Sequence, residues 1–265
     1  MTEIFVNFIL QIISTFGVIA LFGLLFSLCR KGFCKLLGNT GVFIINYVFG
    51  LVGTPIHELS HAVFCLIFGH KIKGINLYSP SKFNSSLGSI TYAYDNFFHR
   101  IGLFFIGIGP VLGGSAAILF LMYLLVPNLY GTLIANINQL TIDNNFFINY
   151  VAVIGDTVPA VFNKVYFDNE CYWIFLVLAL MIASHMELSA SDISGAKLGL
   201  AFLSVLLLVV DAVVYVVAPG LLEAITFITF YFGLFMAKIL IIGAIFNIAL
   251  LIVAVIITLF LRIFE

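Results

Sequence analysis

The chain has 265 residues, of which 63% are hydrophobic and 9% are charged, and its formal net charge is -1. Soluble domains carry about 25% charged residues, so this composition excludes a soluble enzyme, and it is too apolar for a disordered chain. The small net charge provides no basic surface for nucleic acid. At about 20 residues per span, we expect an all-α polytopic membrane protein with about 6–7 transmembrane helices and a small membrane-associated β-hairpin.

The N-terminal part predicts two membrane segments. The first covers residues 4–29 and is followed by a basic loop that begins with Arg30 and Lys31. The second covers residues 41–69 and is interrupted by polar residues between 54 and 61. Ionisable residues inside an apolar segment are costly in a bilayer, so the interruption predicts a functional site.

A polar stretch follows the second segment. Within it, apolar and polar residues alternate on both sides of a turn-rich sequence at 79–86, which predicts a β-hairpin at 73–95. The glycine-rich segment 101–126 is the third predicted span. The apolar part of the next stretch, residues 146–162, is broken by glycine and proline, and we expect it to be a lid or an interfacial piece that does not cross.

The fourth predicted segment covers residues 171–186, and the fifth covers 197–218 and carries Asp211. The last apolar stretch, 221–264, would measure about 66 Å as one helix, about twice the hydrocarbon thickness. We therefore favour two spans that meet near Lys238 over a single helix.

One motif in the sequence indicates a chemical function. Residues 57–61 form an HExxH sequence, and positions i and i+4 share a helix face, so His57 and His61 can reach one metal ion. Glu58 can take a proton from water at the metal. The preceding Pro55 either kinks the helix or, with Thr54 as N-cap, opens a second half-helix at the motif.

A catalytic zinc site normally has three protein ligands and one open position. The candidates for the third ligand are His70, Asp95, His99, Asp156, His185, Glu187, Asp192 and Asp211. The fourth segment is too short to cross the hydrocarbon fully, at about 24 Å, and should end inside the membrane near the metal. Its terminal turn is therefore the expected third-ligand region.

Within this turn, Asp192 and His185 are the preferred third ligands. Asp192 could instead cap the next helix, and His185 could hydrogen-bond a ligand. For Asp211, we favour a bond to a neighbouring helix over a role in orienting a histidine. The spacings Gly109-xxx-Gly113 and Gly195-xxx-Gly199 predict helix-packing faces.

The sequence resembles the site-2 protease family of intramembrane zinc metalloproteases. The resemblance lies in the metal helix around Thr54–Ala62, in the hairpin, and in Gly107-Ile108-Gly109-Pro110 at the start of the third span. In that family a third, aspartate ligand comes from a later core helix, usually within an Asp-Gly motif. Asp192-Ile193-Ser194-Gly195 is the nearest match here.

The resemblance implies one membrane domain, 1–265, with a metalloprotease core at 41–200. Its expected parts are a metal helix at 41–69, the β-hairpin at 73–95, a helix at 101–126, a third-ligand region at 171–196 and C-terminal accessory helices at 197–265. It also implies a zinc-dependent endopeptidase in which His57, His61 and Asp192, or alternatively His185, hold Zn²⁺ and Glu58 is the general base.

The expected partners are the lipid bilayer and a membrane-protein or peptide substrate, with no nucleic acid and no nucleotide. We expect a multi-pass protein of a plasma or inner membrane, with the active site nearer the cytoplasmic face because the hairpin region is basic. Two alternatives remain: an ion or solute transporter that uses intramembrane residues such as Asp211, and a catalytically silent scaffold of the same fold.

Overall fold

The computed structural model describes residues 2–80, 87–94, 96, 99–138 and 146–263. Most of them are helical. The helices are α1 (Thr2–Ile12), α2 (Val18–Phe43), α3 (Gly50–Ile67), α4 (His99–Gly107), α5 (Gly109–Leu125), α6 (Pro127–Asn138), α7 (Phe146–Val161), α8 (Glu170–Ala183), α9 (Ala190–Val217) and α10 (Pro219–Ile263). The strands are β1 (Lys71–Asn76) and β2 (Ser89–Ala93).

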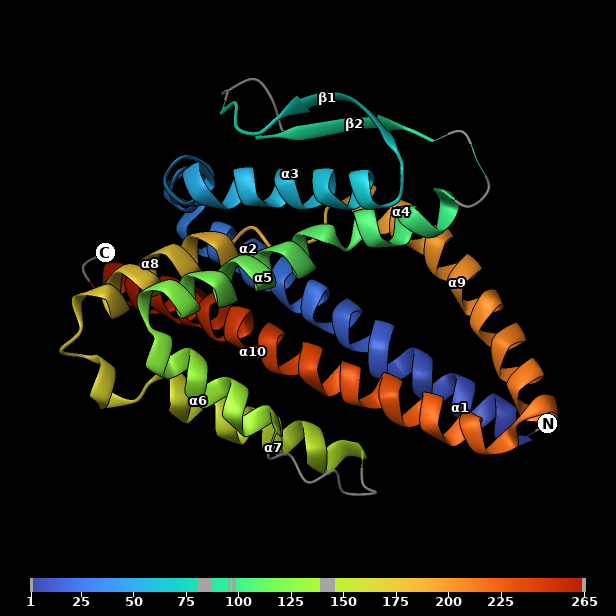
Figure 1. Cartoon of the computed structure of the whole chain (residues 1–265). Coiled ribbons are helices and arrows are strands. Elements are labelled where there is room, and N and C mark those ends of the chain that lie inside the picture. The colour runs from blue at the N-terminus through green and yellow to red at the C-terminus, as the bar shows by residue number, and fades with distance from the viewer. Residues whose placement is uncertain (1, 81–86, 95, 97–98, 139–145, 264–265) are drawn as a thin grey trace.

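The elements are arranged around α10, which packs along α2 (Figure 1). The hairpin lies over α3 at one side of the molecule, and α6 and α7 lie at the opposite side (Figure 1). The π-helical turns Ile13–Gly17 and Ile44–Phe49 join α1 to α2 and α2 to α3. Helix α9 leaves the region of α4 and returns to the start of α10 (Figure 1).

In the described part of the chain, three helical stretches are long and apolar enough to cross a membrane: Ile4–Ile67, Ala190–Val217 and Pro219–Ile263. A fourth is added if the bent pair α4–α5 forms one span. These stretches are compatible with an integral membrane protein. They are fewer than the 6–7 spans predicted from composition, so that number is wrong.

The first two predicted segments differ from expectation because helical residues continue from one into the other. Gly38 interrupts this run with φ 55°, a conformation that glycine adopts without strain. Helix α8 has 14 residues, about 21 Å, which is shorter than the hydrocarbon of a bilayer. Helix α8 is therefore too short to be a candidate membrane span.

The predicted span 101–126 is broken, since α4 and α5 meet at a bend of 56°. Pro110 lies in the first turn of α5, where its missing N–H costs nothing but where it prevents α4 from continuing. By contrast, residues 219–263 form one helix of 45 residues, so the preference for two spans is wrong. Pro219 is the last proline of the sequence, and no breaker follows it.

The predicted hairpin is confirmed as a two-stranded antiparallel sheet in which Ile75 pairs with Ile90 and Lys71 with Ala93. An irregularity between Ile72 and Gly74 shifts the register. Residues 81–86 of the predicted turn lie outside the described residues. The sheet contacts α3 through both strands, so it covers the helix that carries the HExxH motif.

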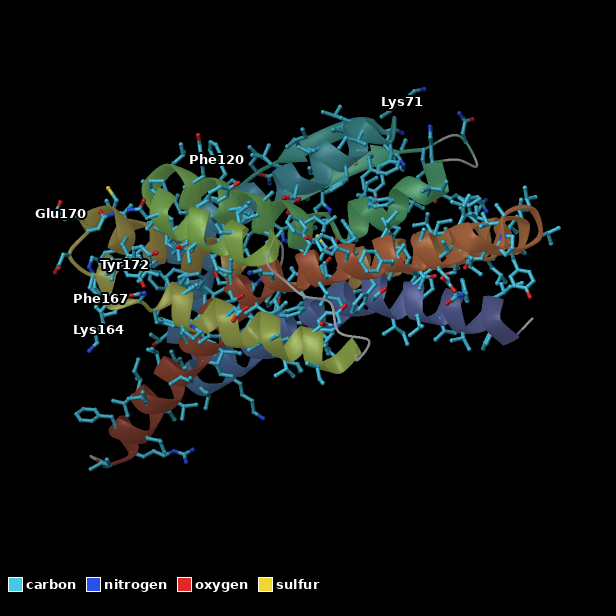
Figure 2. All side chains as sticks on the ribbon, turned by 60° about the horizontal axis from the view of Figure 1, so that its bottom comes forward. Lys71, Phe120, Lys164, Phe167, Glu170 and Tyr172 are labelled. Carbon is cyan, nitrogen blue, oxygen red and sulfur yellow. The ribbon has the colours of Figure 1, made fainter. Side chains whose placement is uncertain are left out.

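The core lies between α2, α5, α8 and α10, where Phe26, Met122, Phe175 and Leu240 are buried. Outward-facing apolar side chains, such as Val216 at 80% exposure, suit contact with lipid. Charged and aromatic side chains gather at the end of the molecule that carries the α7–α8 connection, where Lys164, Phe167, Glu170 and Tyr172 lie close together (Figure 2). Aromatic side chains beside charges are typical of a membrane interface.

Candidate metal centre

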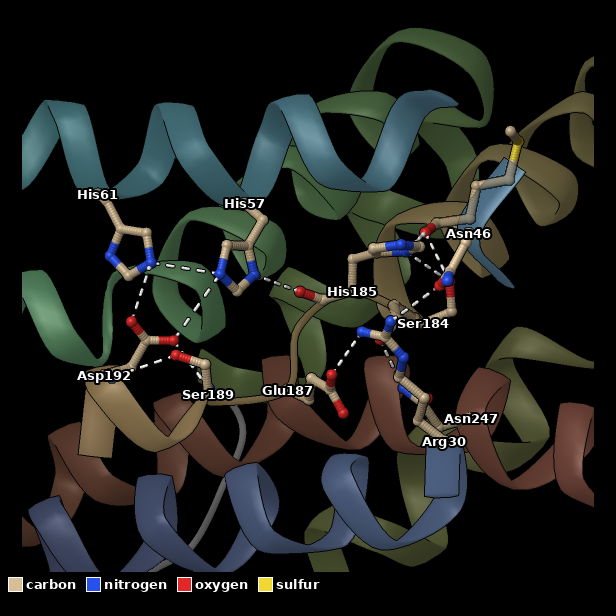
Figure 3. A network of polar contacts seen from close by, with 12 residues as sticks. Arg30, Asn46, His57, His61, Ser184, His185, Glu187, Ser189, Asp192 and Asn247 are labelled. Carbon is tan, nitrogen blue, oxygen red and sulfur yellow. Dashed lines mark hydrogen bonds and ion pairs between the residues drawn. The ribbon is translucent and has the colours of Figure 1, made fainter. Parts of the chain in front are cut away.

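Helix α3 carries the HExxH residues on a continuous helix. Pro55 lies inside α3, and the helix runs unbroken from Gly50 to Ile67. The alternative in which Thr54 caps a second half-helix is therefore wrong. His57 and His61 project from one face toward α9, as expected for residues one helical turn apart (Figure 3).

Backbone carbonyls fix both imidazole rings. The Nδ1 of His57 lies 2.7 Å from the carbonyl oxygen of His185, and the Nδ1 of His61 lies 2.7 Å from that of Ile106. A carbonyl oxygen only accepts hydrogen bonds, so each Nδ1 carries the proton and donates it. In the neutral rings, each Nε2 is then left with a lone pair, the arrangement of a metal-ligating histidine with its outer hydrogen bond.

Asp192 completes the cluster from the first turn of α9. Its Oδ1 lies 3.3 Å from Nε2 of His61, and its Oδ2 lies 3.8 Å from Nε2 of His57. A capping box holds the carboxylate, because Ser189 N–H donates to Asp192 Oδ2 at 2.8 Å and Asp192 N–H donates to Ser189 Oγ at 3.2 Å. The expected capping role and the position beside the histidines thus occur together (Figure 3).

The donor set fits a metal cation. The two Nε2 atoms are 3.2 Å apart, and the ligand atoms of His57, His61 and Asp192 all lie within 4.8 Å of one another. With both Nδ1 protons committed to carbonyls, three acceptors converge on one point without a proton between them. A cation relieves this repulsion. Two imidazoles, one carboxylate and an open position form a common set for catalytic zinc.

Glu58 is buried at 7% exposure and lines a cavity of about 390 Å³ together with the three cluster residues. Leu87 and Gly88, which directly precede β2, and Ser89 at the start of β2 also line this cavity. A Cβ at Gly88 would lie 2.9 Å from Glu58 Oε1, so only glycine fits there without displacing the carboxylate. The cavity thus brings a carboxylate, a candidate metal centre and a strand together.

A second layer of contacts supports the turn between α8 and α9. Arg30 on α2 forms an ion pair with Glu187 and donates to Asn46 Oδ1 at 3.2 Å (Figure 3). Burial raises the pKa of Glu187, and the Arg30 guanidinium acts in the opposite direction. Glu187 is two residues from His185, so the ion pair steadies the carbonyl that orients His57.

His185, the alternative third ligand, contributes its backbone rather than its ring. Its Nδ1 lies near Ser184 Oγ and the Met181 carbonyl oxygen, away from the cluster. Burial lowers its pKa to about 3, so the ring is neutral at physiological pH. The structure therefore brings Asp192, and not the His185 imidazole, to the two motif histidines.

The other predicted candidates lie apart from the cluster within the described residues. Asp211 accepts from Gln11 Nε2 of α1, which matches the expectation of a bond to a neighbouring helix. His70 is buried at the base of the hairpin and bonds the carbonyl of His99, and Asp156 is exposed on α7. Asp95 is outside the described residues.

Sequence reasoning missed two residues of the cavity, Arg30 and Gly88. Arg30 was expected in a basic loop but lies within α2 and lines the cavity. The sequence did contain one indication of the role of Arg30. Glu187 is an acidic residue at the end of an apolar segment, and such a residue requires a basic partner. No family model, curated protein or solved structure matches this chain.

Proposed function

We propose that the protein is a zinc-dependent intramembrane endopeptidase. The observation that carries the proposal is the convergence of His57 Nε2, His61 Nε2 and the Asp192 carboxylate beside Glu58 in one cavity. The resemblance of the HExxH segment to site-2 proteases supports the same reaction class. His57, His61 and Asp192 would hold the metal, and Glu58 would act as the general base.

Zinc bound there would polarise the scissile carbonyl and make water nucleophilic at neutral pH. The residues of the chain supply the remaining parts. Glu58 Oε1 or Oε2 would accept the proton of the attacking water and return it to the leaving amine. The hydrogen bonds to His185 and Ile106 keep the imidazoles in the tautomer that presents Nε2.

The substrate class is a peptide segment of a membrane protein in extended form, because a helix hides its peptide bonds. Each strand of the described sheet pairs on one side, and β2 borders the cavity with Ser89 and Ile90. An unwound segment could add to an edge of this sheet and pass over Glu58. The proposed partners are therefore the bilayer and a membrane-inserted substrate, without nucleic acid or nucleotide.

The proposed location is a plasma or inner membrane, with the cavity nearer the cytoplasmic face. The hairpin that covers the cavity carries Lys71 and Lys73, and Arg100 follows in α4. Basic segments favour the cytoplasmic side. A topology assay with accessible cysteines on the hairpin checks this orientation.

Metal content and cleavage, measured on the same preparations, test the proposal. The wild type should bind about one zinc per chain. His57→Ala and Asp192→Ala should lose the zinc, whereas Glu58→Gln should keep it and lose about 10²–10⁴ of the cleavage rate on a membrane-inserted reporter. Glu223→Gln changes an exposed acid on α10 and is the matched control, with metal and rate unchanged.

Cleavage by Glu58→Gln at the wild-type rate would exclude the proposed mechanism. A wild-type protein without metal would favour the silent scaffold. A second candidate, a transporter, is favoured by the buried Asp211 and Lys238, whose Oδ2 and Nζ atoms have no partner among the described residues. Ion flux in liposomes that persists in Glu58→Gln and stops in Lys238→Leu would support it.

A further inference from the structure

A second polar group lies inside the molecule, away from the metal centre. Asp211 on α9 and Gln11 on α1 are both 0% exposed. Gln11 Nε2 lies 3.4 Å from Asp211 Oδ1 and 3.0 Å from Oγ1 of Thr226 on α10. The side chain of Gln11 thus joins three helices, and each of them belongs to one of the three stretches that are long and apolar enough to cross a membrane.

Two atoms of this group have no hydrogen-bond partner in the described part of the chain. They are Asp211 Oδ2 and Gln11 Oε1, and both are buried. If Asp211 is ionised, both atoms are pure acceptors, and neither can satisfy the other. An ionised carboxylate in this place would also be a buried charge without an ion pair, which is strongly unfavourable in a membrane.

A single proton on Asp211 gives both unpaired atoms a hydrogen-bond partner and removes the buried charge. A carboxylic acid and a primary amide can form a closed ring of two hydrogen bonds, in which each group donates once and accepts once. The bond from Gln11 Nε2 to Asp211 Oδ1 is one half of that ring. A hydroxyl on Asp211 Oδ2 that donates to Gln11 Oε1 is the other half. Both orphaned atoms then have partners, and no charge is buried.

We propose that Asp211 is a membrane-buried proton-binding site, in which the protonated carboxyl and the Gln11 amide form a closed acid–amide pair that latches α9 to α1. The pair is independent of the proposed protease function. It binds a proton as its only ligand, and the proton stays on Asp211 Oδ2 while the latch is closed.

A metal cation is the competing occupant, and the donor set disfavours it. A hard cation such as Ca²⁺ takes six to eight oxygen ligands, and only two oxygens here are without partners. The Thr226 hydroxyl is engaged, because it donates to the Leu222 carbonyl at 2.9 Å and accepts from Gln11. One proton shared between Asp211 Oδ2 and Gln11 Oε1 is enough to pair both of these acceptor oxygens.

Charged groups on the elements that pack against α9 do not neutralise Asp211. Within the described residues, no ion pair reaches it. Glu223 on α10 is exposed, Arg100 lies at the start of α4, and Lys197 lies near the opposite end of α9. The buried Lys238 lies on α10 about 18 Å of helix beyond Thr226. The side chain of Glu3 on α1 is outside the described residues. The amide of Gln11 is therefore the partner that the structure provides.

The position of the pair gives it a mechanical role. The start of α9 packs closely against α4, but after Gly199 the only buried residue of α9 is Asp211, so the later part of this helix has few internal contacts. Asp192 lies in the first turn of α9, and Asp211 lies in its last third. The latch thus holds the end of α9 that is opposite the candidate metal ligand.

Infrared spectroscopy of the purified protein at neutral pH tests the proposal directly. A protonated carboxyl has a carbonyl stretching band that an ionised carboxylate lacks. The difference spectrum of wild type minus Asp211→Asn should contain one such band, and it should shift in deuterated water. Glu223→Gln, which alters an exposed acid, should leave this band in place. A difference spectrum with only carboxylate bands would overturn the proposal.

Thermal unfolding of the same variants provides an independent measurement. Asn at position 211 can form the same two-bond ring with Gln11, so Asp211→Asn should unfold within about 2 °C of the wild type. Asp211→Leu and Gln11→Leu leave polar groups unpaired and should unfold roughly 3–8 °C lower. Equal midpoints for Asp211→Asn and Asp211→Leu would contradict the ring.

The cation alternative has its own signature. If Asp211 held Na⁺ or Ca²⁺, the wild-type midpoint would fall when choline replaced Na⁺ or when a chelator removed Ca²⁺, and Asp211→Asn would abolish that dependence. The proton latch predicts that the difference between wild type and Asp211→Asn stays the same in all three buffers. A salt-dependent difference would replace the proton with a metal ion.

Discussion

Gly88, which lies directly before β2, packs against the side chain of the proposed general base, Glu58. A Cβ at this position would meet Glu58 Cγ at 2.7 Å and the Asn76 carbonyl oxygen at 3.0 Å. The strand therefore limits where the Glu58 carboxylate can lie. A glycine at this point lets the backbone close over the cavity and leaves the carboxylate free to face the metal centre.

Gly88→Ala should preserve the fold and the zinc content, because the two shortest contacts are with the Glu58 side chain, which can move, and the Asn76 carbonyl oxygen at 3.0 Å needs to shift by only a few tenths of an ångström. Cleavage should fall by about 10²-fold, since a shift of about 1 Å in a reacting group has an effect of that size. Gly131→Ala is the control, because nothing lies within 4 Å of an added Cβ there. Equal turnover of the two variants would show that the strand does not position Glu58.

At the scale of elements, the turn between α8 and α9 decides the geometry of the centre. It presents the His185 carbonyl to His57 and starts α9 with the capping box of Ser189 and Asp192. The turn has little regular structure of its own. The ion pair between Glu187 and Arg30 of α2 fixes it from outside.

Arg30→Leu should loosen this turn. Loss of the partner leaves the half-buried Glu187 unpaired, so the unfolding midpoint should fall by roughly 3–8 °C. Zinc affinity should fall by up to about tenfold, because the carbonyl that orients His57 is less well held. Lys35→Leu is the control, since Lys35 is exposed on the same helix and does not act on Glu187. Chelator competition measures the affinity, and equal values for the two variants would contradict the coupling.

The sequence predicted those site residues that lie close together on one helix. His57, Glu58 and His61 lie within two helical turns, so their shared face follows from helix geometry. Asp192 required an argument about segment lengths, and the structure brings it next to both histidines. Arg30 and Gly88 could not be predicted as neighbours of the motif, because tertiary packing alone joins them to it.

The number of spans was predicted less well, and the reason is physical. Hydropathy measures apolar content but not where a helix bends or ends. The turn at Gly38, the 56° bend before Pro110 and the uninterrupted α10 all depend on backbone geometry within apolar sequence. The hairpin was predicted correctly because alternation of side chains is a direct property of strands.

At the scale of the whole molecule, the length of α10 makes the protein sensitive to the thickness of its bilayer. Its 45 residues measure about 68 Å, against about 30 Å of hydrocarbon. The last turns expose Ile256, Leu259 and Leu261, which must be covered by lipid or reach water. Hydrophobic mismatch of this kind is relieved by tilting or by local thickening, each with an energetic cost per ångström.

A thicker bilayer should therefore stabilise the protein. In phosphatidylcholine with chains of about 14, 18 and 22 carbons, the unfolding midpoint should rise with chain length, because less apolar surface of α10 remains unmatched. A variant with serine at Leu259 and Leu261 should show a weaker dependence. A midpoint that is highest in the thinnest bilayer would mean that α10 lies along the membrane surface rather than across it. In the expected case, the stability of this fold depends on hydrocarbon thickness, and the protein is most stable in the cellular membranes that are thickest.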